Sequence, residues 1–531
     1  MRGKRLQLLA MVATLAVVAA ACTGSSTKPS GGSPSAGNAA FTYSLTSQVM
    51  IGWDPSTGYS NEIVAMNNMY ETLTRYNPQT KSLDPLLATS WESSDGGKTW
   101  TFTLRDGVMF HTGKPMTSTD VKASIERTME LNQGAAYIWG AVKSIDAPDP
   151  QTVVFHLKYS APLDLIASAD YAAYIFDTSA TSGDLNTWFE QGHEAGTGPY
   201  VLDAWNKGQE TELRLKAFPD YWGGWDGSHY TNMVFRVVPQ ATTAAQLLQS
   251  EQVSLVERLT PQLWQTFQSQ DGFSTTDSSS WQTLLAMLNT ASGPLADVRL
   301  RQAIAAGVDW NGMMSALHGA AQPLSGIVPP GLWGHVDGLD LTYDAQKATD
   351  LLKQAGYGPG GKPLDLTLTY LQGDSDEQLV ASLMKSDLAK LNVNLDVRPL
   401  AWPAQWAKAK SSDPAQHQDI LLFYWWPDYA DPYSWFINLF HTEDKPYFNL
   451  SYYSDPALDT TMNKAEALAA SDRSSAESMY ADMQQTIAQE VPALSIYTQV
   501  YQRAMLSSVG GFDENPAYPN VVFAYDLTPS G

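Results

Sequence analysis

The sequence predicts an α/β protein built from two or three packed regions, and three observations lead to this fold class. The chain has 531 residues, which is more than one hydrophobic core accommodates, and 44% of them are apolar. Strand-like and helix-like stretches alternate between residues 343 and 426, which is typical of a parallel sheet covered by helices. The first third of the chain instead mixes antiparallel strands with helices.

The chain begins with a predicted export signal, residues 1–21. A basic start precedes the apolar run from Leu6 to Ala21, which is shorter than the roughly 20 residues of a membrane-spanning helix and therefore predicts a segment that is removed. The small residues before Cys22 resemble a bacterial lipobox, although Ala19 stands where this motif usually carries Leu or Val. Cys22 is therefore the predicted lipidation site. Residues 22–40 are rich in Gly, Ser and Pro, which predicts a flexible tether.

Cysteine content and charge exclude several classes of protein. Cys22 is the only cysteine, so the chain cannot form an internal disulfide, a Cys-ligated zinc site or a redox pair. The formal net charge of −23 is spread along the chain, and an acidic surface repels nucleic acid. Nucleic acid is therefore not an expected partner.

The first third of the chain contains a predicted hairpin and a predicted helix. Asp95, Gly96 and Gly97 separate two strand-like stretches, as in a β-hairpin. The stretch 117–131 begins with polar residues and then places Val121, Ile125 and Met129 at four-residue spacing, which indicates an amphipathic helix.

The stretch 343–426 predicts a different arrangement. A helix that ends near Gly356 precedes the alternating strand 363–370, and a second helix and the strand 393–399 follow. A short helix that carries tryptophan then leads to the strand 419–426. Both faces of this last strand are apolar, so we expect it to be central, with helices on both sides of the sheet. Two helical stretches, 455–470 and 472–489, and one further strand complete the pattern.

Motifs of catalysis are missing from the sequence. It contains no HExxH, no phosphate-binding GxxxxGK, no GxSxG and no paired CxxC, and its histidines are scattered. A pair of carboxylates for glycoside hydrolysis stays open, because only geometry identifies such a pair among many acidic residues. We therefore expect a binding protein rather than an enzyme, without a cofactor and without a metal site.

Aromatic residues gather at the carboxyl end of the strand predicted to be central. Trp402 and Trp406 come first, and Tyr424, Trp425 and Trp426 run into a turn at Pro427. Ligands of open α/β sheets bind at this end of the strands. Tryptophan and tyrosine combine large apolar faces with one polar atom, so the cluster predicts a ligand pocket.

Several segments together resemble one family, the family-five extracellular solute-binding proteins of ABC importers, whose members bind oligopeptides, dipeptides or nickel. The longest match is YETLTRYNPQTKSLDPLLATSWESSDGGKTWTFTLRDGVMFHTGKPMTSTDV. Further matches are GTGPYVLDAW, AFPDYWGG, PLADVRLRQAIAAGVDW, YDAQKATDLLKQAGY and the run that begins at WWPDYADP. They cover residues 41–501 in the order of the family.

The resemblance implies a two-lobed, periplasmic-binding-protein-like fold with hinge strands and an extra α+β domain inserted in the first lobe. Carried onto this chain, lobe I comprises residues 41–72, 196–285 and 500–531. The inserted domain comprises residues 73–195, and lobe II comprises residues 286–499.

The resemblance also assigns ligand-binding residues. In peptide-binding members, an Asp in the segment that matches WWPDYADP pairs with the α-ammonium of the ligand, and this position is Asp428. Asp431 is the second candidate, although its place before a proline suits a turn. Trp402 and Trp425 match positions that line side-chain pockets, and Tyr59, Tyr137 and Trp139 match segments that face the cleft from the other lobe. The aromatic cluster adds Tyr424 and Trp426 as candidates.

One position departs from the pattern of the family. Some oligopeptide binders carry an Arg six residues before the Asp, where it meets a carboxylate of the ligand, and this chain has Leu422 there. The departure leaves room for longer peptides, and also for oligosaccharides or other small solutes that stack on tryptophan.

The expected function is therefore that of a monomeric, exported binding protein, anchored by Cys22 to the outer face of the cytoplasmic membrane. It would capture peptides and deliver them to the permease and ATPase subunits of an ABC importer. The alternatives are the same role for another solute, a secreted hydrolase, and a sensor that reports its ligand to a partner.

Overall fold

The structure is a computed structural model that describes residues 40–47, 49–205 and 211–529. The predicted export signal, the predicted lipidation site Cys22 and the predicted tether up to residue 39 lie outside the described residues. No helix among the described residues is both long and apolar enough to cross a membrane.

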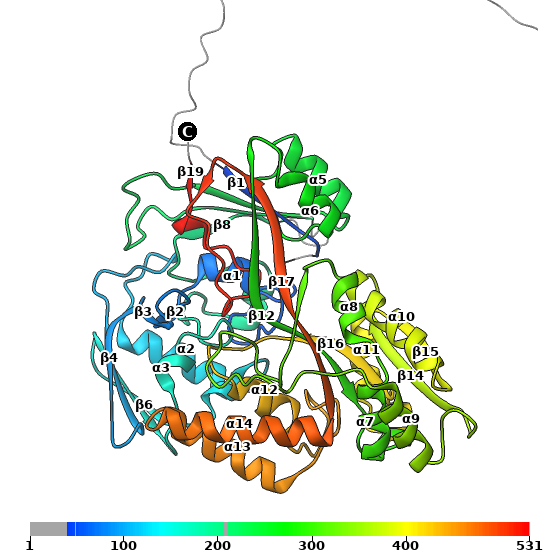
Figure 1. The fold of residues 1–531 in the computed structure, drawn as a ribbon. Helices are drawn as coiled ribbons and strands as arrows, with labels where there is room; N and C mark the ends of the chain where they lie inside the picture. The colour runs from blue at the N-terminus through cyan, green and yellow to red at the C-terminus, as the bar shows by residue number, and fades with distance from the viewer. Residues whose placement is uncertain (1–39, 48, 206–210, 530–531) are drawn as a thin grey trace, which may run out of the picture.

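One mixed sheet runs through the whole molecule, with 11 strands among the described residues. Two long strands, β12 and β17, pair antiparallel at its centre and pass from one half of the molecule to the other (Figure 1). In spatial order the strands are β15 (Val393–Leu400), β14 (Leu364–Leu371), β16 (Ile420–Trp425), β12 (Phe273–Leu288), β17 (Ala493–Leu506), β11 (Leu255–Val256), β1 (Ala40–Leu45), β10 (Asn232–Val237), β9 (Glu212–Ala217) and β8 (Tyr200–Trp205), with β13 (Ala321–Pro323) beside β17.

The half of the sheet next to β16 confirms the parallel arrangement predicted for residues 343–426. β14 pairs parallel with β15 and with β16. β16 lies between β14 and β12, so it is central as predicted, and Ile420 to Phe423 are buried. Helices cover these strands at the right of Figure 1. Four of them close a separate apolar core around β14 and β16, namely α7 (Val298–Ala306), α8 (Trp310–Ala316), α9 (Ala345–Gln354) and α10 (Ser375–Ala389). The fifth helix, α11 (Trp402–Ala409), contacts β14 but packs its apolar residues into the largest core.

The region 73–195 forms its own antiparallel sheet in the order β4, β5, β7, β6. The predicted hairpin is confirmed, because β4 (Ala88–Ser94) pairs with β5 (Thr99–Leu104) across the turn at Asp95. Asp95, Gly96 and Gly97 all have positive φ, the conformation that favours Gly and tolerates Asp. The predicted amphipathic helix is α2 (Ser118–Leu131), which begins at a capping box between Thr117 and Asp120. The other elements are β2 (Thr74–Asn77), β3 (Ser82–Pro85), β6 (Val142–Asp149), β7 (Thr152–Leu157), α3 (Leu163–Ile166), α4 (Leu185–Glu190) and the 3₁₀ helix Ala136–Trp139.

The predicted helices near the end of the chain are α13 (Pro456–Ala469) and α14 (Arg473–Glu490). They lie at the bottom of Figure 1, near β6. Ala470, directly after α13, lies against Gly97 of the β4–β5 turn, so this segment packs on the antiparallel sheet of region 73–195. The remaining elements are α1 (Ile63–Met69), α5 (Ala241–Gln249), α6 (Pro261–Phe267), α12 (Tyr433–Leu439), β18 (Val509–Gly510), β19 (Thr528–Pro529) and the 3₁₀ helices Pro294–Ala296, Pro414–Gln416 and Ala524–Asp526.

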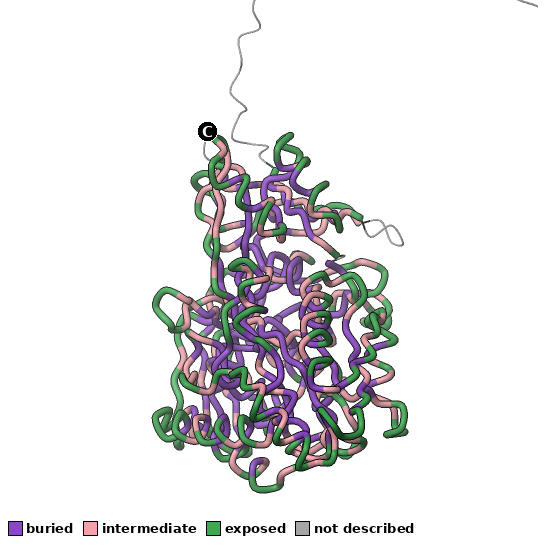
Figure 2. The backbone as a smooth tube through the Cα atoms, turned by 45° about the vertical axis from the view of Figure 1, so that its right-hand side comes forward, coloured by how far each residue is buried: buried purple, intermediate pink, exposed green. Residues whose placement is uncertain are grey.

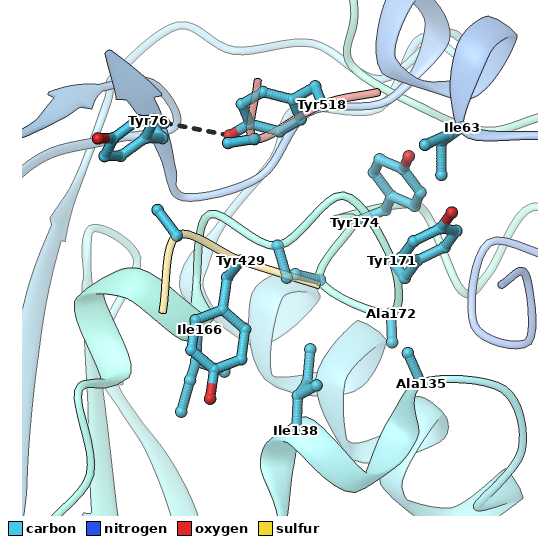
Figure 3. Packing of buried hydrophobic residues seen from close by; sticks show 14 of the residues in the cluster. Ile63, Tyr76, Ala135, Ile138, Ile166, Tyr171, Ala172, Tyr174, Tyr429 and Tyr518 are labelled. Atoms are coloured by element: carbon cyan, nitrogen blue, oxygen red, sulfur yellow. Dashed lines mark hydrogen bonds between the residues drawn. The ribbon is translucent and has the colours of Figure 1, made fainter. Parts of the chain in front are cut away.

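The largest apolar core joins segments that are far apart in the sequence. Buried stretches of the chain run through the interior in Figure 2, and Figure 3 shows one part of this core in detail. There the backbone N–H of Tyr76 donates to the hydroxyl of Tyr518 over 3.1 Å, and Tyr429, from the loop after β16, lies beside Ile166. The loop after β16 is therefore anchored in the core that also contains region 73–195.

A buried ion pair fixes the central strand β17 to the C-terminal segment. The side chain of Arg503 is fully buried, and its Nε and Nη2 donate to the two carboxylate oxygens of Glu514 over 2.7 and 2.9 Å. Its Nη1 also donates to the hydroxyl of Tyr43 in β1 over 2.7 Å. This two-point geometry satisfies both charges without water, which is the condition under which a buried pair is tolerated.

We expect Arg503→Leu to lower the free energy of unfolding by about 3–5 kcal/mol, because Glu514 would keep its burial and lose its counter-ion. Urea unfolding followed by tryptophan fluorescence measures this loss. The matched control is Arg398→Leu, which breaks the solvent-exposed pair with Asp396 and should change stability by less than about 1 kcal/mol. Equal losses for the two variants would contradict the role of Arg503.

Candidate ligand-binding cleft

Two adjoining cavities form one cleft. The inner cavity has a volume of about 90 Å³ and the outer one of about 830 Å³, and Tyr59, Ser60, Gly134, Tyr137 and Trp402 line both. The inner cavity is walled on one side by residues of the loops before α1 and after α2, and on the other by α11, the end of β16 and the turn that follows it. Its lining residues are Tyr59, Ser60, Gly134, Ala135, Tyr137, Tyr171, Trp402, Trp406, Phe423, Tyr424, Trp425, Trp426, Asp428 and Phe448.

Asp428 supplies the carboxylate of the inner cavity. It follows β16, where the strand has ended and the chain turns at Pro427, and its residue surface is only 8% exposed. Its Oδ2 accepts hydrogen bonds from the hydroxyls of Tyr137 and Ser434, the latter over 2.8 Å. Asn438 donates in turn to the hydroxyl of Tyr137 over 2.7 Å, so the position of the phenol is fixed from both sides.

Two opposing effects act on the pKa of the Asp428 carboxyl group. Burial raises its pKa, while the hydrogen bonds from Tyr137 and Ser434 act in the opposite direction. Its Oδ1 accepts no hydrogen bond from any other described residue, and no described Lys, Arg or His pairs with the carboxylate. A desolvated carboxylate with one open oxygen favours a cation in the cavity.

Asp431, the second candidate, lies elsewhere. It is fully buried, and its Oδ1 accepts the backbone N–H of Tyr433 over 2.8 Å, so it caps the turn that starts α12. It lines neither cavity. Burial raises its pKa to about 7.

The aromatic residues predicted around β16 and α11 all line the inner cavity. The rings of Trp402 and Trp406 stack with their centroids 5.1 Å apart, and Trp402 is 41% exposed. Trp425 and Trp426 are held by hydrogen bonds from their indole N–H groups to Ser434 and Tyr171, over 3.3 and 2.9 Å. The hydroxyl of Tyr424 meets that of Tyr497 in β17 at 2.8 Å, so its polar atom is engaged with the central strand.

Comparison with known proteins bears on the family of this chain. Residues 82–447 match the model of the bacterial extracellular solute-binding proteins, family 5 Middle. The chain belongs to this family. The probable D,D-dipeptide-binding periplasmic protein DdpA of Escherichia coli is 28% identical over 442 residues, which cover 82% of this chain and 83% of that protein. Di/tripeptide-binding protein 2 of Pseudomonas aeruginosa is 25% identical and covers 88% of this chain and 91% of its own length.

Solved structures establish the fold of this family-five protein. The periplasmic binding protein DppA from Helicobacter pylori, in complex with the peptide STSA, superposes with a TM-score of 0.80 at 23% identity and covers 93% of this chain and 98% of its own. The oligopeptide-binding protein AppA from Bacillus subtilis, in complex with a nonapeptide, gives 0.79 at 19% identity and covers 93% and 100%. The expected two-lobed, periplasmic-binding-protein-like α/β fold is confirmed.

The structure corrects the prediction that Trp139 faces the cleft of this family-five protein. This residue is 1% exposed and absent from the lining of either cavity. Its indole N–H donates to the carbonyl of Ala172 over 2.8 Å, and its ring stacks on Phe155. Tyr137 and Trp139 stand two residues apart on a 3₁₀ helix, so their side chains point about 120° apart, one to the cavity and one to the core.

Leu422, where some family members carry Arg, is also a core residue. It is fully buried in the apolar cluster around β14 and β16 and does not line the inner cavity, whereas Phe423 and Tyr424 do. Six residues that line the inner cavity were not predicted as site residues from the sequence, and all except Phe423 lie outside the helices and strands: Ser60, Gly134, Ala135, Tyr171, Phe423 and Phe448. No group of three or more metal-ligating side chains occurs among the described residues.

Because Trp139 is buried and Trp402 is half exposed, we expect their replacement by Ala to lower the free energy of unfolding by different amounts. We expect Trp139→Ala to lower the free energy of unfolding by about 3–5 kcal/mol, because it leaves a cavity in the core. Trp402→Ala should change stability by less than about 1 kcal/mol, because the side chain is already half exposed. Urea unfolding of both variants measures the difference, and a larger loss for Trp402→Ala would contradict the assignment of Trp139 to the core.

Proposed function

We propose that this protein is the lipid-anchored, substrate-binding component of an ABC importer, which captures peptides in the cleft and delivers them to the permease. The observation that carries this proposal is Asp428, a buried carboxylate with an open oxygen at the end of an aromatic cavity. The α-ammonium of a peptide is a cation that suits it, and apolar walls suit side chains of varied shape. Relatives named for dipeptides and di/tripeptides support peptides as the ligand class.

Closure of two lobes over the ligand is part of this proposal. We assign residues 41–72, 196–285 and 500–531 to lobe I, residues 73–195 to the inserted domain and residues 286–499 to lobe II. The passage of β12 and β17 between the two halves of the sheet supports these as the hinge strands. We further propose that residues 1–21 are the export signal, that residues 22–40 form the tether, and that lipidated Cys22 anchors a monomer at the outer face of the cytoplasmic membrane.

A second candidate ligand class is an oligosaccharide or another small solute. The stacked pair of Trp402 and Trp406 favours it, because a half-exposed indole face offers a stacking surface to a sugar ring. Relatives vary in their named ligands, since heme-binding protein A of Haemophilus influenzae is 25% identical over 527 residues. Catalysis is not part of either proposal, because these relatives are named as binding proteins.

We expect Asp428→Asn to weaken the binding of peptides at least about thirtyfold, because it removes one partner of a desolvated charge pair and keeps the shape. N-acetylation of the peptide should weaken binding to the original protein to a similar degree and should add little to the loss in the variant, because both changes remove the same interaction. Calorimetric titration with a pool of short peptides measures both effects.

Two further variants complete this test: one is a control, and the other distinguishes peptides from oligosaccharides. Glu92→Gln removes an exposed charge on β4, outside both cavities, and should leave the affinity unchanged. For an oligosaccharide, Trp402→Ala should weaken binding more than Asp428→Asn, because stacking rather than charge would hold the ligand. Unchanged peptide affinity in Asp428→Asn would overturn the role of Asp428 as the ammonium anchor.

For the anchor we expect Cys22→Ser to release the protein from the membrane fraction, because the lipid attaches to the thiol. Cell fractionation followed by immunoblotting measures the distribution. Retention of the variant on the membrane as firmly as the original would contradict lipidation at Cys22.

A further inference from the structure

Negative charge extends beyond Asp428 along the cleft. The carboxylates of Asp428, Glu62 and Glu443 line the two cavities. Among the described residues, no Lys or Arg lines either cavity. His441 is the one histidine of this lining. The cleft is thus more acidic than the single anchor of a neutral peptide requires.

Glu62 is a second buried carboxylate of the cleft without a counter-ion. It is 3% exposed and lines the outer cavity, directly before α1. Its Oε1 accepts the backbone N–H groups of Tyr59 and Ser60 over 2.6 and 3.0 Å, which fixes the orientation of the carboxylate. Its Oε2 is buried and accepts no hydrogen bond from another described residue. Burial raises the pKa of Glu62, so its charged form gains from any cation that enters.

Asp170 adds a second uncompensated carboxyl group next to the inner cavity. It is fully buried, and neither of its side-chain oxygens accepts a hydrogen bond from another described residue. Its backbone N–H donates to the carbonyl of Asp428 over 3.2 Å, so the two acidic residues are neighbours. Its side chain does not line the cavity, and burial raises its pKa well above the usual value of an aspartate.

Lys410, a basic side chain that lies against the aromatic wall, offsets the charge of Glu443 but pairs with neither Glu62 nor Asp428. The ammonium of Lys410 lies 3.8 Å from the ring centre of Tyr447 and 5.0 Å from that of Trp406. It is near Glu443, whose carboxylate already accepts backbone N–H groups of the loop 447–449. Lys410 lines neither cavity, and Glu62 remains without a cation.

We propose that the cleft selects ligands with a second positive charge, namely peptides in which a Lys or Arg side chain reaches Glu62 in the outer cavity while the α-ammonium meets Asp428. The inference rests on the proposed peptide-binding function and adds the charge class of the peptide to it. The shared lining residues Tyr59, Tyr137 and Trp402 connect the two carboxylates, so one ligand can meet both. Their aromatic rings also favour a cation over an anion.

Calorimetric titration with matched peptides tests the proposal. The probes are tetra-alanine peptides with one lysine at position 1, 2 or 3, and their norleucine counterparts, which keep the apolar stem and lack the charge. We expect the best lysine peptide to bind at least about tenfold more tightly than its norleucine counterpart. Glu62→Gln, which keeps an oxygen acceptor for the two backbone N–H groups, should reduce this ratio below about threefold. Glu92→Gln, the exposed control, should leave the ratio unchanged.

The outcomes separate this inference from the peptide proposal. Equal affinities for the lysine and norleucine peptides, with both still weakened by Asp428→Asn, would overturn the second-charge inference and leave peptide binding intact. Binding of spermidine that depends on Glu62, with no binding of any peptide, would support the charge selection and overturn peptides as the ligand. A lysine preference that survives in Glu62→Gln would overturn the assignment to Glu62.

Discussion

The antiparallel pairing of β12 with β17 is the constraint on which the arrangement of the molecule depends. These strands pair from Phe273 with Leu506 to Met287 with Ala493, so the two halves of the sheet cannot separate without breaking this ladder. A register shift between Ser279 and Thr283 interrupts it near the middle, at the level where the strands leave one half for the other. The buried pair of Arg503 and Glu514 then fixes β17 on the side of β1. Because β16 pairs with β12, the turn that carries Asp428 is positioned by the same ladder.

In the described part of the chain, carboxylates that are buried without a cation occur in the cleft, and also away from it, at Asp431 and Glu377. Arg503 and Glu514 are buried together and satisfy each other, whereas Asp428, Asp170 and Glu62 are buried without a cation among the described residues. Desolvation of a lone carboxylate destabilises the charged form, and the raised pKa of each of the three expresses this cost. A cationic ligand that pairs with such a group would offset this cost.

The sequence predicted the elements that follow simple rules and missed those that depend on tertiary contacts. Alternating apolar patterns identified β14 and β16, and the double apolar face of β16 placed it centrally, because both follow from local periodicity. The family resemblance placed Asp428 at the end of that strand. Trp139 was assigned wrongly because no sequence pattern tells which face of a one-turn 3₁₀ helix meets the core. Tyr171 and Glu62 were not found because loop residues carry no periodic signal, and the fold alone brings them to the cleft.

The unpaired carboxylates of Asp428 and Glu62 give a physical reason why ligand binding and closure of the cleft would be coupled. Contacts across the cleft, such as those of Tyr137 with Asp428 and of Trp426 with Tyr171, bring the walls together and take the carboxylates out of water. In the absence of a cation, the desolvation of Asp428 and Glu62 opposes this approach, and in its presence the attraction favours it. A ligand shifts a conformational equilibrium only by its difference in affinity for the two states, and a ligand with one cation at Asp428 and a second at Glu62 would provide that difference. A neutral solute of the same shape would fill the aromatic cavity and leave the opposing electrostatic term in place.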